Sequence, residues 1–262
     1  MYDFELVKPK SVDEAVSALA AEDAQPLGGG QTLIPTMKQR LAAPAVLVST
    51  HDIDGMKGVS TDGGVMTVGG ATTHGTVAKE AASAFPGLAG LAAKIGDPAV
   101  RNRGTIGGSL ANNDPAACYP AALLAAGGTV VTNAREIAAD DFFEGMFTTA
   151  LEEGELITVV KFNIPEKSNY QKFEQPASRF PLVGVFVAKH SDEVRVGVTG
   201  ASEDGVFRWT EAEQALSSNF SAEAISGLTV SADGMIGDLH GTPDYRAHLV
   251  KVMTGRAVSA AE

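Results

Sequence analysis

Cysteine is nearly absent from this sequence, in which Cys118 is the single cysteine among 262 residues. One thiol cannot form an internal disulfide, and it cannot supply the ligands of a four-cysteine zinc site or of an iron–sulfur cluster. Histidine is also sparse, with five residues, no pair at the i, i+4 spacing of a metal site and no HExxH motif. We therefore expect no metal centre in this chain.

Positive charge and long apolar runs are scarce too. Twenty Lys and Arg against 32 Asp and Glu give a formal charge of −12, which disfavours a nucleic-acid partner. A bound nucleotide remains compatible with this charge, because backbone N–H groups can hold phosphate. No stretch approaches the roughly 20 apolar residues of a transmembrane helix, and the N-terminus lacks the basic start and apolar run of a secretory signal. We expect a cytoplasmic protein with no transmembrane segment.

Glycine, by contrast, is abundant and gathers in two loops about seventy residues apart, GGGQT at 28–32 and TIGGS at 105–109. Glycine lets a backbone approach a ligand closely, and converging N–H groups form an anion site. For either loop alone, a plain tight turn is the favoured interpretation. Neither the P-loop nor the Rossmann fingerprint is present. Two such loops suit a diphosphate held between two subdomains.

Hydrophobic periodicity and capping signals predict an α+β chain, mixed at first and then a small strand-then-helix unit. The capping box at 11–14 predicts a helix there. Residues 104–114 are expected to form a loop, after which Asp114 and Pro115 would cap and start a helix. Two short helices are predicted within 73–95, one at 210–216 capped by Thr210 with Glu213, one from about Pro243 to Ala257, and strands at 46–50, 65–69, 128–132, 155–164, 182–189 and 193–200.

Two segments carry a specific family resemblance. LGGGQTLIPTMKQRLAAPAVLVST and IGDPAVRNRGTIGGSLANNDPAACYPAALLA resemble the FAD-diphosphate segments of the medium subunits of aerobic carbon monoxide dehydrogenases and related xanthine-oxidase-family hydroxylases. ELITVVKFNIP and KFEQPASRFPLVGV are similar as well, so the resemblance covers nearly the whole chain. It implies a two-subdomain FAD-binding domain of the PCMH/vanillyl-alcohol-oxidase type at 1–170. A small C-terminal domain of antiparallel sheet plus helices would follow at 171–262.

The resemblance also implies the cofactor contacts, with one departure. Where several relatives carry a carboxylate that bonds the sugar chain of the cofactor, this sequence has Cys118, and a thiol is a poor acceptor. Either Asp114 takes that role or the contact is lost. The pyrophosphate would be cradled by Gly28, Gly29, Gly30, Gln31, Thr32, Thr105, Ile106, Gly107 and Gly108; Ser109 and Asn113 would lie near the ribityl or ribose hydroxyls; Ile157 and Lys172 fall in segments that approach the flavin.

Four other side chains have two interpretations each. His51 or His74 could form a covalent flavin link, although surface or helix-capping positions are the favoured interpretation. Tyr119 and Phe180 could stack on the flavin ring, although ordinary packing is the favoured interpretation for each. Phe180 follows a segment that lies beside the ring in relatives.

The function implied is that of a flavoprotein subunit of a molybdenum hydroxylase. A large molybdopterin subunit would oxidise the substrate, and a small subunit with [2Fe-2S] clusters would pass electrons to FAD in this chain and on to an external acceptor. The assembly would be a dimer of heterotrimers, and the isolated chain would not turn over substrate. The alternatives are a stand-alone FAD-dependent oxidoreductase of the same fold and a FAD-free docking protein.

Overall fold

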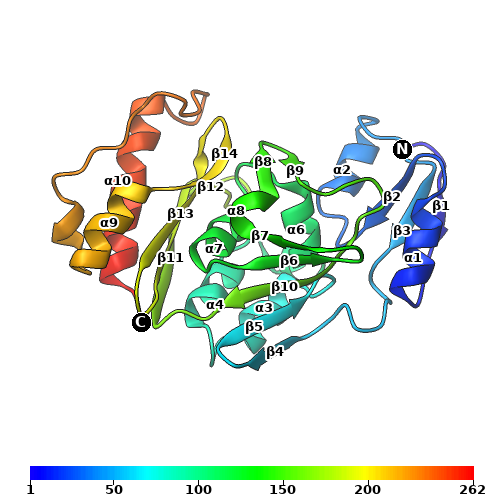
Figure 1. The fold of residues 1–262 in the computed structure, drawn as a ribbon. Coiled ribbons are helices and arrows are strands. Elements are labelled where there is room, and N and C mark those ends of the chain that lie inside the picture. Colours follow the sequence, from blue (N-terminus) through cyan, green and yellow to red (C-terminus); the bar gives the residue numbers. More distant parts are fainter.

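The computed structural model describes all 262 residues, arranged as three units in a row (Figure 1). Each unit has its own cluster of buried hydrophobic side chains, of 7, 29 and 19 residues from the N-terminal to the C-terminal unit. The predicted α+β class is confirmed, with a two-part first region followed by a small antiparallel sheet plus helices. No helix is both long and apolar enough to cross a membrane.

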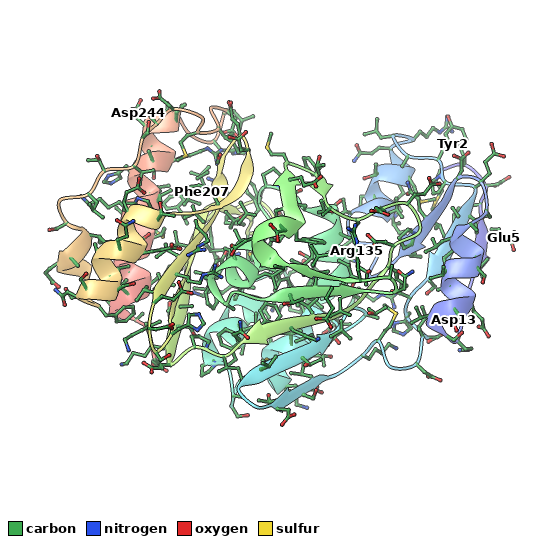
Figure 2. The ribbon with its side chains drawn as sticks, in the orientation of Figure 1. Tyr2, Glu5, Asp13, Arg135, Phe207 and Asp244 are labelled. Carbon is green, nitrogen blue, oxygen red and sulfur yellow. The ribbon has the colours of Figure 1, made fainter.

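The N-terminal unit is a small parallel sheet with two helices, in strand order β1-β3-β2. Ser11 caps α1 as predicted, since its Oγ accepts from Glu14 N–H at 3.2 Å, while the Glu14 carboxylate accepts from the N–H of Lys10, one residue before the cap, at 2.7 Å. Acidic side chains such as Glu5 and Asp13 lie on its outer surface (Figure 2). The elements are β1 (Glu5–Val7), α1 (Val12–Leu19), β2 (Ala24–Leu27), α2 (Leu33–Lys38) and β3 (Val46–Ser49).

The central unit is a five-stranded antiparallel sheet in the order β4-β5-β10-β6-β7, with helices packed on it. Alternation along the strands buries one face: in β5, Met66 and Val68 are fully buried between partly exposed neighbours. Its strands are β4 (Val59–Asp62), β5 (Val65–Gly69), β6 (Thr129–Thr132), β7 (Glu136–Ala138), β8 (Phe143–Gly145), β9 (Thr148–Thr149) and β10 (Ile157–Asn163); its helices are α3 (His74–Glu80), α4 (Pro86–Ala93), α5 (Pro98–Arg101), α6 (Ile106–Asn112), α7 (Tyr119–Ala125) and α8 (Ala139–Phe142).

The C-terminal unit is an antiparallel meander, β11-β12-β13-β14, with helices on its outer face. The two middle strands are buried along almost their whole length, because α10 packs on one side and α7 of the central unit on the other. The elements are β11 (Lys167–Glu174), β12 (Pro181–Lys189), β13 (Val194–Ser202), β14 (Gly205–Arg208), α9 (Thr210–Ser218), the 3-10 helix η1 (Ala222–Ile225) and α10 (Pro243–Ser259).

Three local predictions were wrong. Residues 104–114 are largely helical, because Thr105 Oγ1 caps the Gly108 N–H and starts α6 despite two glycines. The next helix, α7, begins at Tyr119 rather than after Asp114, whose carboxylate instead closes a tight turn onto Ala116 N–H at 2.8 Å. Thr210 does not cap α9, because Glu213 accepts from Val196 N–H and from Arg208.

A buried cation joins the central and C-terminal units. Arg195 of β13 donates to the Leu124 carbonyl at 2.9 Å and to the Asp140 carboxylate at 2.6 Å. The side chain of Arg195 is 10% exposed. Its removal would take one donor from the Leu124 carbonyl, which also accepts from Gly127 N–H at 3.1 Å, and would leave Asp140 with only the longer contact to Arg208 at 3.6 Å.

We predict that Arg195→Ala lowers the free energy of unfolding by about 2–4 kcal/mol, because a partly buried charged pair and a carbonyl bond are lost together. Chemical denaturation followed by circular dichroism measures this. Lys189→Ala is the control, since Lys189 pairs with Glu166 at an exposed site and such pairs contribute about 0–1 kcal/mol. Equal effects of the two substitutions would contradict a joining role for Arg195.

Candidate cofactor site

The first glycine loop leaves a run of backbone donors free. It follows β2 at the edge where the three parallel strands end, and it leads into α2. The N–H groups of Gly28, Gly29, Gly30, Gln31 and Thr32 donate to no protein acceptor. Gly30 has φ +69°, a left-handed conformation that turns the chain within the run. Consecutive free N–H groups of this kind form an anion-binding concavity.

The missing side chains of this loop make room for other protein atoms. A Cβ on Gly29 would overlap the carbonyl of Arg103 and the Cα of Gly104, and a Cβ on Gly28 would lie 2.7 Å from Thr105 Oγ1. The first loop therefore lies directly against the second. Gly28 and Gly29 contact residues 103–105 and 108, so the two glycine loops are neighbours in space.

In the second loop most donors are already used. The N–H of Ile106 donates to Thr72 O at 3.0 Å, that of Gly107 to Gly70 O at 2.9 Å, and those of Gly108 and Ser109 to Thr105. A Cβ on Gly107 would lie 2.6 Å from the Gly70 carbonyl oxygen, so this glycine permits the contact. Gly108 is exposed, and a Cβ there would meet only Thr105 Oγ1. The open part of this loop is the surface at Gly108.

Ile157 lies behind the two loops, at the start of β10. A Cβ on Gly70 would overlap the Ile157 carbonyl, and Gly70 N–H donates to Thr158 O at 2.7 Å. The side chain of Ile157 is buried. The pair Gly69-Gly70 thus connects β10 to the second loop, a contribution that sequence reasoning missed although two adjacent glycines at a strand end were a visible signal.

His74 supports the second loop from inside the protein. It is the first residue of α3, 5% exposed, and a Cβ on Gly104 would lie 2.5 Å from its Nε2. Its ring lies 5.4 Å from that of Tyr119, and its Nδ1 has no hydrogen-bond partner. Burial, aided by the charge of Arg101, lowers the pKa of His74 to about 4, so the imidazole is neutral at pH 7. The favoured surface or capping position for His74 is wrong.

The far end of α6 holds a hairpin in place. Asn113 adopts the left-handed conformation (φ 41°, ψ 46°), is 2% exposed, and donates both amide hydrogens, to Gly145 O at 2.7 Å and Thr148 O at 2.9 Å. The backbone carbonyl of Asn113 accepts from Phe147 N–H at 3.0 Å. The carboxamide donors expected to face a sugar hydroxyl are therefore already engaged with the β8–β9 hairpin.

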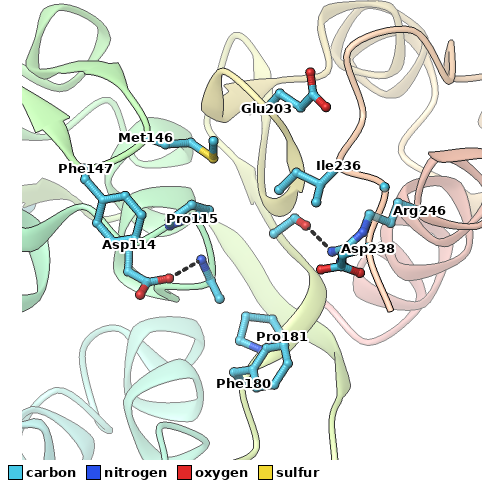
Figure 3. A pocket seen from close by; sticks show the side chains of 13 residues that line it. Asp114, Pro115, Met146, Phe147, Phe180, Pro181, Glu203, Ile236, Asp238 and Arg246 are labelled. Atoms are coloured by element: carbon cyan, nitrogen blue, oxygen red, sulfur yellow. Dashed lines mark hydrogen bonds and ion pairs between the residues drawn. The ribbon is translucent and has the colours of Figure 1, made fainter. Parts of the chain in front are cut away.

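A pocket of about 470 Å³ opens beside this hairpin, between the central and C-terminal units (Figure 3). Asp114, which follows α6, lies on one side with Met146 and Phe147 of the hairpin. Phe180 and Pro181 line another side, and the remaining wall comes from the C-terminal unit. Since α6 has seven residues, its two ends are about 10 Å apart.

Lys172 fixes the loop that brings Phe180 to the pocket. Its side chain is 1% exposed, and its ammonium donates to Lys94 O at 2.7 Å and to Arg179 O at 2.5 Å. Phe180 packs edge-on against His240, with ring centroids 5.3 Å apart. The ammonium of Lys172 thus binds the turn before β12 and has no hydrogen bond to either glycine loop.

Cys118 lies deep in the same region. The thiol is buried at the start of α7, near Lys172 and the hydroxyl of Tyr170. Burial raises the pKa of the Cys118 thiol, so the sulfur is a neutral, weakly polar group. Asp114, unlike Cys118, reaches the pocket.

Comparisons with known proteins find one family consistently. A domain family described as "FAD binding domain in molybdopterin dehydrogenase" matches residues 2–167. The nicotine 6-hydroxylase medium subunit of Paenarthrobacter nicotinovorans is 34% identical over 95% of this chain and 94% of its own, and the carbon monoxide dehydrogenase medium chain of Afipia carboxidovorans is 30% identical over 99% and 96%. A solved structure of carbon monoxide dehydrogenase from Hydrogenophaga pseudoflava superposes with a TM-score of 0.88 at 32% identity, covering 99% and 97% of the two chains.

We predict that Gly29→Ala and Gly107→Ala each weaken FAD binding at least tenfold, or about 1.4 kcal/mol, because the added Cβ would push neighbouring backbone away and distort the donor run. Equilibrium dialysis measures the dissociation constant. The matched control is Gly90→Ala, which meets no atom within 4 Å on the exposed side of α4 and should stabilise the protein by up to about 1 kcal/mol. Unchanged FAD affinity in both loop variants would contradict the role of the loop contact.

We also predict a pH dependence from His74. With a folded-state pKa of about 4 against an ordinary 6.5, the unfolded chain binds the extra proton between these values. Stability is therefore unaffected above pH 6.5 and falls by up to about 3 kcal/mol as the pH drops through 6.5 towards 4. Denaturation from pH 7 to pH 4.5 should show a shallower decline for His74→Gln than for the wild type. The exposed His51→Gln is the control, and parallel profiles for all three proteins would show that His74 is not responsible.

Proposed function

This chain belongs to the family of FAD-binding domains in molybdopterin dehydrogenases, and we propose that it is the subunit through which electrons leave a multi-subunit molybdenum hydroxylase. The observation that carries the proposal is the pairing of two features along α6. Free N–H donors lie near its first turn, and a mixed apolar and polar pocket lies at its last. This separation of about 10 Å suits a diphosphate at one end and a flavin ring at the other.

The diphosphate would lie on the first loop. The five free N–H groups of 28–32 can donate to phosphate oxygens without any basic side chain, which suits a chain of net charge −12. The hydroxyl of Thr32 is exposed beside them. The second loop would close the opposite side through Gly108 and Ser109, while Thr105, Ile106 and Gly107 hold the two loops together.

The flavin ring would enter the pocket between the central and C-terminal units. Phe147 and Phe180 provide flat apolar surfaces there, and Lys172 holds the Phe180 turn by its backbone. Asp114 would accept a hydrogen bond from the ribityl chain, because Cys118 is buried and does not line the pocket. Asn113 would act indirectly, by fixing the hairpin that carries Phe147.

When bound, FAD exchanges electrons one or two at a time and so links single-electron clusters to a final acceptor. The single cysteine of this chain leaves cluster ligation to another subunit. We propose a small [2Fe-2S] subunit and a large molybdopterin subunit as partners, in a dimer of heterotrimers. Substrate choice would belong to the large subunit, and the role of this chain is to hold and orient the cofactor.

We further propose that the FAD-binding domain ends close to residue 170. The strand pairing of the C-terminal sheet starts at Lys167, so the connection at 164–166 is the natural boundary, a few residues before the division expected from the sequence. The matched family segment ends at 167.

The test is expression of the chain alone and with its two partner subunits. Alone, it should fold but be recovered partly empty, because Asp114 alone replaces a carboxylate at 118, and it should not oxidise carbon monoxide, aldehydes or N-heterocycles. Co-expression should restore a full flavin content and turnover. The extracted flavin, identified by mass, should be FAD.

Two results would contradict the proposal. Extraction of FMN alone would remove the need for a diphosphate site. Substrate turnover by the isolated chain would instead show a self-contained flavoenzyme. Flavin content and turnover are measured separately, so a failure of cofactor binding is distinguishable from a failure of assembly.

A further inference from the structure

The start of α3 is tied to the start of the second glycine loop. The N–H of His74, the first residue of α3, donates to Gly104 O at 3.0 Å. The N–H of Ile106 donates in the opposite direction, to Thr72 O at 3.0 Å. Residues 73 and 105, between these two bonds, form a short antiparallel bridge. The main chain of His74 is therefore fixed opposite Gly104.

The imidazole of His74 fills the space beside Gly104. A Cβ on Gly104 would lie 2.5 Å from its Nε2 and 2.9 Å from its Cδ2, both too close for real atoms. The ring is 5% exposed and packs with the ring of Tyr119 at a centroid distance of 5.4 Å. Its Nδ1 has no hydrogen-bond partner, and burial, aided by the charge of Arg101, lowers the pKa of His74 to about 4. At neutral pH the ring therefore acts on Gly104 by its size and not by a charge.

Gly104 is also the residue against which the first loop packs. A Cβ on Gly29 would lie 2.4 Å from the Cα of Gly104 and would overlap the carbonyl of Arg103. One residue thus touches both the imidazole and the loop that carries the free N–H groups of 28–32. Closely packed interiors transmit small displacements, because few voids are present to absorb them. A change of volume at His74 should therefore reach the donor run through Gly104.

We propose that His74 is a positioning residue for the cofactor, whose ring holds Gly104 against Gly29 and so keeps the N–H groups of 28–32 in the arrangement that binds a diphosphate. The inference rests on the proposed function, which assigns the diphosphate to these donors. His74 has this effect through Gly104 and needs no contact with the cofactor. Truncation of the ring would let the second loop shift, because the surroundings of a truncated side chain move partly into the space that it leaves.

Proteolysis of the cofactor-free chain tests the position of the second loop directly. Arg103 is exposed, so trypsin can cleave the bond between Arg103 and Gly104 whenever this segment opens locally. His74→Ala should speed cleavage at this bond about fivefold or more, because the ring no longer holds Gly104. Mass spectrometry identifies the cleaved bond, and circular dichroism shows that each variant is folded. Equal cleavage rates for the wild type and His74→Ala would overturn the proposal.

The matched control for proteolysis is Val77→Ala. Val77 lies one turn later in α3 and is fully buried, so its truncation also removes packing from this helix. It is not among the nearest atoms that a Cβ on Gly104 would meet. Cleavage after Arg103 should therefore stay at the wild-type rate. An equal acceleration by Val77→Ala and His74→Ala would show a general loosening of α3 and would contradict a specific role for the ring.

Size compensation, measured by FAD binding, is the second test. Equilibrium dialysis of the full chain gives the dissociation constant. His74→Ala and Gly104→Ala should each weaken FAD binding about tenfold or more, the first by removing the ring and the second by a clash with it. In the double variant, the added methyl group occupies space that the ring no longer fills. The loss of affinity in the double variant should therefore be about tenfold smaller, or more, than the product of the two single losses.

The outcomes separate the inference from the proposed function. Single losses that simply multiply in the double variant would overturn the contact between the ring and Gly104 as their cause. An absence of FAD binding by the wild type would contradict the proposed function itself. Normal binding by the wild type together with equal binding by His74→Ala would overturn the inference alone.

Discussion

The candidate cofactor site depends on two close approaches of backbone to backbone, which involve the glycines Gly29, Gly104, Gly70 and Gly107. Gly29 touches the carbonyl of Arg103, and Gly107 touches that of Gly70, at distances that no Cβ allows. These contacts join the N-terminal parallel sheet, the second loop and the end of β5 at one point. The N–H groups of residues 28–32, on the first loop at this point, donate to no protein acceptor. The absence of a side chain at these glycines is required mainly by the packing of protein backbone, and less by the approach of a ligand.

A second constraint is the double burial of α7. All seven of its residues are buried, because the helix lies between the central unit and the C-terminal sheet. Gly197 of β13 makes this possible, since a Cβ there would overlap the Ala121 carbonyl. Thr199 and Gly200 then bind Pro115 O at 2.7 Å each, just ahead of the helix. The pocket lies where the central and C-terminal units meet, because they leave space between Asp114 and Glu203.

The sequence predicted the elements whose structure is decided by neighbouring residues, and it failed for elements that depend on distant contacts. Strands with alternating burial such as β5, and helices with a capping side chain such as α1, were predicted because their neighbours in sequence decide them. The helix α6 was not, because two glycines and several small polar residues disfavour a helix locally, and contacts of Ile106 and Gly107 with Thr72 and Gly70 override that preference. For the candidate site, residue types indicated two loops, and the structure places these loops against each other. The N–H groups of the first loop are free and those of the second loop are largely bonded. This difference depends on hydrogen bonds to distant residues, which no pattern in a single sequence reveals.

The double engagement of Asn113 has a thermodynamic consequence. Its backbone ends the helix whose first turn borders the donor run, and its carboxamide holds the Phe147 hairpin at the pocket mouth. Any free energy that couples cofactor binding to the order of this hairpin must act equally in both directions. A partner that binds the hairpin would then raise the affinity for FAD by a certain factor, and FAD would raise the affinity for the partner by the same factor. Assembly and cofactor loading would then be coupled equilibria, each favouring the other.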